Sequence, residues 1–428
     1  DDSGDYILLD GFNGASRNPY HTFAILQLRL GGSTILNGYH NQVLTSADGT
    51  VEPTVAMDAA LIHADLVGST AVAVGETPGA AYCSWRRTLA QRVGQYALVV
   101  DDLAFRSDSR NMMAKTTWQV PGGRWDPEEQ VLRLPSANVE LHSCDIQDVQ
   151  PGRVVTMNFS RAVKQGDHRI AFYLLGHVHD DSPNPLACTR VGANAAALAL
   201  PEPAMAVAGQ NGKTNGDHVV LAKDHLFGLG LTGAGVENVI ARSDVPVSLD
   251  WDFAAGAAEL VVSMTTTLEF RLAASDKLCV DGQPTTPRAN TLCTVILKKG
   301  RHRITGASPP AEARAELAEY LNRLLSDGLK RREAALAVAV HSAAPAAKQL
   351  PTTMLAQFEG AVVDMCAIPT SEEAQLAVAT GNSIHLMTAD GQTIRTLETD
   401  DKIRVLRWWD DPALLLAGCV DEQVIAFD

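Results

Sequence analysis

The chain has 428 residues, with 35 Lys and Arg against 50 Asp and Glu, so its formal net charge is −15. This length predicts two or three domains, and an apolar content of 46% is enough to build their cores. The sequence contains no basic stripe of the kind that binds nucleic acid. No apolar run approaches the roughly 20 residues that a membrane-spanning helix needs, so we expect neither nucleic-acid binding nor a membrane span.

The N-terminus and the cysteines give two further expectations. The first residue is Asp1 rather than Met, and strand character begins at residues 6–10, so we expect an end cut from a longer protein. A missing signal peptide then carries no information about localisation. The seven cysteines are odd in number, scattered and free of CxxC pairs, which argues against a disulfide scaffold or a thiolate zinc site. We expect most of them to be small buried apolar side chains.

Residues 1–307 read almost entirely as β-strands. Examples are the runs at 22–30, 96–101, 169–175 and 259–264, which are short and rich in β-branched or aromatic residues. Each run is bounded by Gly, Asp, Asn or Pro, and helical periodicity is nearly absent. This pattern predicts a mainly β fold built on a large antiparallel β-sandwich.

The character of the sequence changes at residues 308–350. After Ser308-Pro309-Pro310, leucines such as Leu317, Leu321 and Leu324 recur at helical spacing, and an alanine-rich stretch follows at 334–347. We interpret this segment as a helical linker between two bodies.

Residues 351–428 show a weak internal repeat. Residues 363–365 align with 403–405, and residues 384–387 align with 424–427, an offset of 40 residues that is typical of one propeller blade. Because a closed propeller needs roughly four to eight blades, this region predicts a partial β-propeller of about two blades. We expect the C-terminus to be cut as well.

Two short motifs resemble a dinucleotide-binding loop and a metal site, but we interpret both as structural. Residues 228–233 match GxGxxG, but residues 236–243 leave no room for the helix of a βαβ unit, so we interpret them as a glycine-rich turn. His177 and His179 alternate along a strand and could share a metal ion. Ser182 and Pro183 then break the HxHxDH pattern, so we interpret these histidines as solvent-facing residues at a strand end.

A cluster near the N-terminus offers residue types that transfer protons. Tyr20 and His21 end a loop rich in Gly, Asn and Pro, at the entry to a strand where side chains can face a cleft. Tyr and His are suited to general acid and base roles. The alternative is that His21 is an ordinary hydrogen-bonding loop residue.

The order of several segments is more specific than any one of them. A strand ending in Asp10-Gly11 precedes the loop of His21, then come residues 31–38, the turn His40-Asn41, and the runs 85–89 and 96–103. This order, across roughly residues 5–120, resembles the C-terminal β-sandwich of heparinase II/III-like polysaccharide lyases. The resemblance implies an α/α toroid ahead of the sandwich, which supplies much of the substrate cleft and a Tyr and which these residues do not include.

The resemblance also assigns roles to single residues. It implies that His21, with Tyr20 beside it, is the catalytic candidate of the sandwich. Arg17 could pair with a uronate carboxylate or a sulfate, for which a guanidinium is suited, and His40 and Asn41 are candidates for substrate contact. Trp85 and Arg87 are expected to be core and structural residues.

A metal site in the family would use positions that this chain changes. Asn37 stands where the family has a metal-ligating aspartate, and the loop at 17–22 keeps the single histidine His21. His40 remains as the counterpart of a metal-binding histidine. Because His21, Asn37 and His40 form a site poor in charge, we expect no cofactor and no tightly bound metal, with zinc as the weak candidate.

Together these expectations describe part of a secreted or periplasmic lyase that cleaves an acidic, uronate-containing polysaccharide by β-elimination. The net charge of −15 opposes attraction of an anionic polymer, although a local basic cleft can override it. The alternative is a catalytically inactive carbohydrate-binding or scaffold module, with the propeller making contacts to a protein partner. Tyr20-His21 and His40-Asn41 favour the enzyme, and Asn37 favours the alternative.

Overall fold

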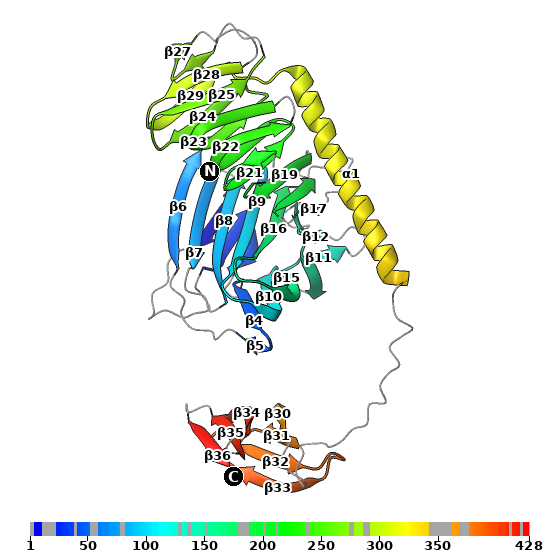
Figure 1. Cartoon of the computed structure of the whole chain (residues 1–428). Helices are drawn as coiled ribbons and strands as arrows, with labels where there is room; N and C mark the ends of the chain where they lie inside the picture. Colours follow the sequence, from blue (N-terminus) through cyan, green and yellow to red (C-terminus); the bar gives the residue numbers. More distant parts are fainter. Residues whose placement is uncertain are drawn as a thin grey trace. The chain divides into compact units, whose positions relative to one another are not determined.

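The computed structural model divides into two compact units, residues 1–338 and residues 339–428 (Figure 1). Within them, the structure describes residues 4–10, 23–37, 41–51, 59–77, 82–126, 131–134, 138–150, 152–177, 188–192, 194–199, 203–210, 213–236, 239–273, 278–285, 292–341, 362–368, 376–410, 413–419 and 423–427. Every strand pair among these residues is antiparallel, and one long helix is present, which confirms the predicted mainly β fold.

The first unit begins with two small sheets, which we call the first layer because buried residues of both belong to one apolar core. The three-stranded sheet has the order β1 (Tyr6–Leu9), β2 (Ile25–Leu30), β3 (Ser33–Asn37). The five-stranded sheet has the order β14 (Ile146–Gln150), β15 (Arg153–Val163), β10 (Ser109–Gln119), β4 (Val43–Ala47), β5 (Thr50–Val51).

An eight-stranded sheet forms the middle layer. Its order is β11 (Arg124–Asp126), β12 (Val131–Leu134), β13 (Val139–His142), β16 (His168–His177), β9 (Tyr96–Phe105), β8 (Cys83–Arg92), β7 (Thr70–Thr77), β6 (Ala60–Val67). The strands β8 and β9 lie near its centre and pair over their whole length.

A thirteen-stranded sheet forms the third layer. Its main path is β17 (Cys188–Gly192), β18 (Ala195–Ala199), β19 (Pro203–Ala208), β21 (His218–Ala222), β22 (His225–Val236), β23 (Val239–Asp252), β24 (Ala257–Val262), β29 (Gly300–Thr305), β26 (Cys279–Val280), β27 (Gln283–Pro284). Off this path, β20 (Thr214–Asn215) pairs with β22, and β25 (Thr266–Arg271) pairs with β23 and with β28 (Leu292–Leu297).

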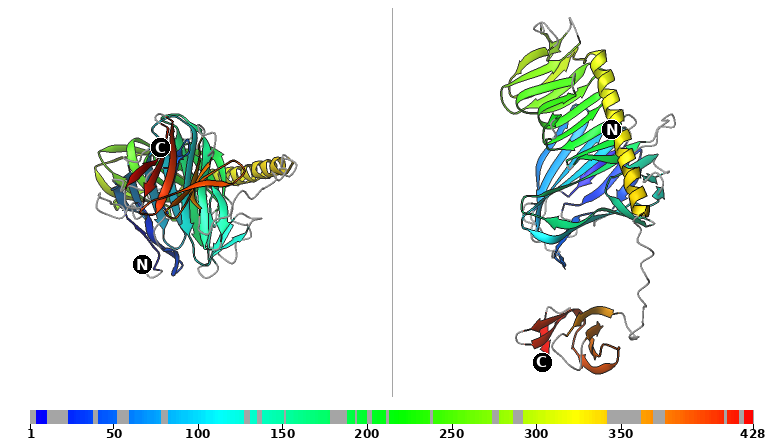
Figure 2. Two further views of the ribbon diagram at one scale, coloured as in Figure 1. Left: turned by 90° about the horizontal axis from the view of Figure 1, so that it is seen from below. Right: turned by 45° about the vertical axis from the view of Figure 1, so that its right-hand side comes forward.

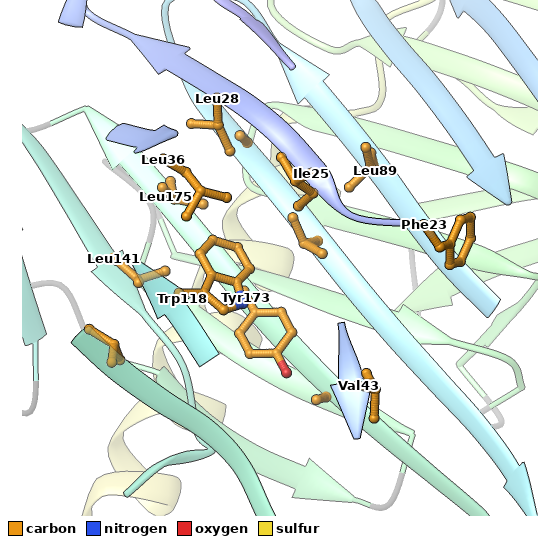
Figure 3. Packing of buried hydrophobic residues seen from close by; sticks show 14 of the residues in the cluster. Phe23, Ile25, Leu28, Leu36, Val43, Leu89, Trp118, Leu141, Tyr173 and Leu175 are labelled. Carbon is orange, nitrogen blue, oxygen red and sulfur yellow. The ribbon is translucent and has the colours of Figure 1, made fainter. Parts of the chain in front are cut away.

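The middle sheet is covered on both faces because alternate residues of its strands point to opposite sides. On β9, Val99 and Leu103 belong to the core shared with the first layer, which Figure 3 shows around Trp118 and Tyr173. The next residues, Leu98 and Val100, belong instead to the core shared with the third layer. The strand is therefore apolar on both faces, as the continuous run at 96–100 suggests.

The far face of the third layer is covered by the helix α1 (Ala311–His341), which runs beside this sheet in Figure 1 and in the right-hand view of Figure 2. Ala313, Leu317 and Leu321 are buried in the core between the helix and the sheet. Their spacing of four residues places them on one helix face. We predicted residues 308–350 to be a linker, whereas the structure assigns the helix as far as residue 338 to the first unit. In the described part of the chain, no helix is long and apolar enough to span a membrane.

The second unit contains two small sheets. One has the order β30 (Val362–Ala367), β31 (Leu376–Thr380), β32 (Ser383–Met387), β33 (Thr393–Glu398), and the other has the order β34 (Ile403–Asp410), β35 (Ala413–Cys419), β36 (Val424–Phe427). One apolar core joins the two sheets, and Asp364 accepts a hydrogen bond from the backbone of Leu406 across them at 2.9 Å. The strands β30 and β34 begin 41 residues apart, and so do β32 and β36. The described residues close no propeller ring, and the partial propeller of about two blades stays a prediction.

One local expectation was wrong, whereas the expectation that most cysteines are buried is confirmed, since four of the seven are buried. Residues 228–233 lie inside β22 rather than in a turn, and the pairing with β23 shifts register between Gly228 and Leu231, where Gly230 has φ +61°. Glycine adopts this conformation without a steric penalty, so the motif forms a bulged strand. A disulfide joins Cys144 to Cys188, whose Cα atoms are 5.6 Å apart. The other five cysteines are free, and three of them are buried.

Candidate functional site

The predicted site falls largely outside the described residues. Arg17, Tyr20, His21 and His40 all lie in the segments 11–22 and 38–40, which the structure does not describe. The backbone of Asn37 ends β3 and pairs with Gln27, but its side chain is likewise outside the description. Asn41 is described, and so are the residues at which the two segments are attached to the sandwich.

The segment 11–22 is closed at its base by backbone hydrogen bonds. The amide of Asp10 donates to the carbonyl of Ala24 at 2.9 Å, and the amide of Phe23 donates to the carbonyl of Asp10 at 3.1 Å. Phe23 has φ +61°, which is rare for a bulky side chain. Its ring packs edge-on against Trp85 at 4.8 Å between centroids. The ring also lies so close to Gly75 that a Cβ there would be 1.9 Å from it. The chain just after His21 is therefore held in place.

A buried ion pair lies beneath this base. Arg87 on β8 and Asp101 on β9 are directly opposite in the strand register, and both side chains are 0% exposed. The guanidinium donates to the two carboxylate oxygens at 2.7 and 2.9 Å, and the indole of Trp85 donates to Oδ1 at 2.9 Å. Such a two-pronged pair fixes the orientation of the guanidinium. The prediction that Trp85 and Arg87 are core and structural residues is confirmed.

The same guanidinium joins the ends of the two undescribed segments. Its Nη1 donates to the carbonyl of Phe23 at 3.1 Å and to Oδ1 of Asn41 at 3.0 Å, and its Nη2 donates to the carbonyl of Asn41 at 2.9 Å. Phe23 follows His21 by two residues, and Asn41 follows His40 directly. Arg87 therefore ties together the attachment points of both predicted site segments.

Asn41 itself is buried and fully engaged with the protein. Its side-chain amide donates to the carbonyl of Ile25 at 2.8 Å, and its Oδ1 accepts from the amide of Ile25 at 2.7 Å, so it imitates a paired strand residue. Thr116 donates to its carbonyl at 3.0 Å. All the contacts described for this side chain are with the protein, and its predicted contact with a substrate stays a prediction.

A second buried polar cluster, which was not predicted from the sequence, joins the middle and third layers. Asp250 on β23 accepts hydrogen bonds from Arg92 at 3.0 Å, from the backbone of Ser69 at 2.9 Å and from Thr70 at 3.2 Å. Nε2 of His225 lies 2.6 Å from the same carboxylate. Apart from the neighbours Ser69 and Thr70, the members come from separate stretches of sequence, so no motif connects them.

The protonation of this cluster follows from its contacts. Burial tends to raise the pKa of Asp250, but the hydrogen bond and charge of His225, together with Arg92, outweigh it and hold that pKa below its ordinary value. Burial lowers the pKa of His225 in spite of the nearby carboxylate. Burial also raises the pKa of Tyr96 well above its ordinary value. Among the described residues, these contacts connect Arg92 and Thr70 of the middle layer to His225 and Asp250 of the third layer.

Among the described residues, no group of three or more His, Cys, Asp or Glu side chains is placed to hold a metal ion. The weak candidates His21, Asn37 and His40 have side chains outside those residues. The backbone of His177 pairs with Val139 at the end of β16, whereas His179 lies outside the description.

Comparison with known proteins gives partial likeness. No protein-family model and no curated protein matches the chain. Among solved structures, it is similar to a heparan sulfate lyase from Pedobacter heparinus, at 10% identity over 46% of this chain and 35% of that chain, with a TM-score of 0.30. A heparinase III with methylated lysines matches at 13% identity, 51% and 40% coverage, and a TM-score of 0.30. The chain therefore spans less than half the length of these proteins, and a likeness of this size does not by itself establish an activity.

Proposed function

We propose that this chain is the β-sandwich part of a polysaccharide lyase that cleaves an acidic, uronate-containing polymer by β-elimination. In this proposal His21 and Tyr20 transfer protons, and Arg17 pairs with an acidic group of the sugar. His40 completes the wall of the cleft, and Asn41, predicted to contact the substrate, holds the chain next to His40 through its bonds to Ile25 and Arg87. The Arg87 network is the observation that carries the proposal.

The network supports the proposal because it meets a geometric requirement. Two residue groups that act on one sugar must be held near each other, and a 1 Å misplacement can cost a large part of the rate. Arg87 bonds to Phe23, two residues from His21, and to Asn41, next to His40. Chain connectivity allows about 3.8 Å per residue between Cα atoms, so the two histidines are tethered to one buried cation. Arg87 acts in this proposal as a positioning residue.

The disulfide supports the location that we propose, outside the cytoplasm. Disulfides persist in oxidising compartments such as the periplasm and the extracellular space, and they are rare in the cytosol of most organisms. Cys144 and Cys188 form such a bond between parts of the sandwich that are 44 residues apart. A periplasmic or extracellular location also gives the protein access to a polysaccharide substrate.

A second candidate function is a carbohydrate-binding or scaffold module without catalysis. The contacts of Asn41 favour it, because its amide is used by Ile25 and Arg87 and not offered to a ligand. Asn37 in place of an acidic residue favours it too. In this reading the two sheets of residues 362–427 are propeller-like blades that contact a protein partner.

The test is an activity assay on this chain and on the longest natural protein that contains it. Both are incubated with uronate-containing polymers, and the absorbance of the unsaturated product is followed. We expect activity in the longer protein and a loss of at least about a hundredfold with His21→Ala, the range for a general acid or base. His168→Ala, an exposed histidine of β16 paired with Asp102, is the matched control and should keep full activity.

The possible outcomes separate the two functions. Equal activity of the wild type and His21→Ala would remove the catalytic role of His21. Binding of the polymer with no unsaturated product, in wild type and variant alike, would favour the binding module. Loss of activity in both histidine variants would show that the effect is not specific to the predicted site.

A further inference from the structure

A cavity of about 260 Å³ lies between the middle and third layers. Its polar lining comes from His63 on β6, Arg86 on β8, and Asp217 and His218 just before and at the start of β21. Apolar side chains such as Val74 and Leu229 form the rest of the wall. The cavity is near the lower end of the range for small-molecule sites, which is roughly 300–1,000 Å³. It can hold a ligand the size of one six-membered ring.

Two imidazole nitrogens in the lining of this cavity have no hydrogen-bond partner among the described residues. His218 is a buried residue, and its Nδ1 has no hydrogen-bond partner among the described residues. Nε2 of His63 is buried and unpartnered in the same sense. Buried polar atoms without partners are uncommon in folded proteins, and each one needs an explanation. Two such nitrogens in the lining of one cavity indicate that a ligand completes them.

The position of Asp217 depends on a feature of the strand beside it. The amide of Asp217 donates to the carbonyl of Leu229 at 2.9 Å, and its own carbonyl accepts from Gly209 at 2.8 Å. Its carboxylate lies over Gly230, where a Cβ would be 2.8 Å from Oδ2. The bulge of β22 at Gly230 therefore makes room for an exposed carboxylate at the cavity.

The charges define what kind of ligand fits. Arg86 is paired across the strands with Glu76 at 3.3 Å, and a guanidinium has further donors beyond one such contact. Burial, with the positive charge of Arg86 as a second cause, lowers the pKa of His218 to about 4. This imidazole is therefore neutral at pH 7 and suits a hydroxyl group rather than an anion. Arg86 suits a carboxylate, and Asp217 can accept from another hydroxyl.

From this set of groups we propose that the cavity binds a small polyhydroxylated carboxylate of one ring. The carboxylate of the ligand pairs with Arg86, and its hydroxyl groups bond to His63, His218 and Asp217. None of the lining residues belongs to the set proposed for β-elimination, so the binding test is independent of that function.

The test is a binding titration by calorimetry on the full chain at pH 7, with three probes of similar ring size. D-glucuronate carries both the carboxylate and the hydroxyls, D-glucose lacks the carboxylate, and cyclohexanecarboxylate lacks the hydroxyls. We expect glucuronate to bind at least about tenfold more tightly than either of the others, a difference of about 1.4 kcal/mol. Equal binding of glucose or of cyclohexanecarboxylate, or no binding of glucuronate, would overturn the proposal.

Variants locate the binding in this cavity. Arg86→Gln and His218→Gln should each weaken glucuronate binding about tenfold or more. The Arg86 side chain is 41% exposed, so Arg86→Gln is the variant expected to fold normally. Arg303→Gln is the matched control, because Arg303 is an exposed arginine paired with Glu259 on another part of the sheet, and it should bind like the wild type. Unchanged binding in Arg86→Gln would refute the site.

Discussion

The two interfaces of the middle sheet use the same kinds of residue in different ways. Toward the first layer, Arg87 and Asp101 are fully buried, and every contact of the guanidinium holds a part of the protein. Toward the third layer, Arg86 is the next residue of the same strand, and it faces a cavity with unpartnered imidazole nitrogens. We infer that the saturation of its contacts, rather than the residue type, distinguishes an arginine that positions other parts of the protein from one that we propose to bind a ligand.

The largest expected effect comes from breaking the saturated interface. Arg87→Met removes the cation and leaves Asp101 as an uncompensated buried charge, which costs about 3–5 kcal/mol of unfolding free energy. Urea denaturation of wild type and variant measures this. Arg86→Gln is the control, since its pair is partly exposed, and it should change the free energy by about 1 kcal/mol at most. Similar effects of the two substitutions would contradict the distinction drawn between the two interfaces.

A smaller effect is expected from the covalent tie at the other interface. Cys188 belongs to the core between the middle and third layers, and Cys144 packs against that core. Removing the bond with Cys144→Ser and Cys188→Ser should lower the free energy of unfolding by about 2–4 kcal/mol, because a loop of this length is no longer closed in the unfolded chain. A reductant should destabilise the wild type and leave the double variant unchanged. If the reductant leaves the free energy of unfolding of the wild type unchanged, the bond does not form.

The third expected effect is a pH dependence of the free energy of unfolding. The pKa of His218 is lowered from 6.5 to about 4 in the folded protein. Between these values the unfolded chain binds a proton that the folded chain does not, so stability falls as the pH falls. One such group lowers the free energy of unfolding by up to about 1.4 kcal/mol per pH unit. His218→Gln should reduce this slope between pH 6.5 and pH 4 in urea denaturation. The same slope in both proteins would show that His218 is not buried as described.

The strand content could be predicted because its signals are local. The run at 96–101 lies in β9, and the leucines after Pro310 lie in α1. The residues that align at the 40-residue offset lie in two small antiparallel sheets. The division into layers could not be predicted. Because β9 is apolar on both faces, its sequence shows no alternation that would tell which neighbour covers which side.

The disulfide and the cavity were missed for a related reason. Cys144 and Cys188 are 44 residues apart with no spacing motif, and only the packing of the layers brings them together. His63 and His218 are single histidines on different sheets, so neither carries a signal alone. Arg87 was recognised as structural from the resemblance, but its contacts with Phe23 and Asn41 depend on pairing between distant segments. The glycines around Gly230 were interpreted as a turn because glycine with positive φ is common in turns and in β-bulges alike.

The double covering of the middle sheet has a consequence for how the first unit opens. Strands β8 and β9 are buried along nearly their whole length, so their amides meet solvent only when both outer layers have separated. Hydrogen exchange of these amides should then report the global free energy of unfolding, whereas peripheral strands such as β6 exchange through smaller openings. The centre of this sheet is where the unit stays protected longest, and the anchor of the proposed catalytic loop is built into it.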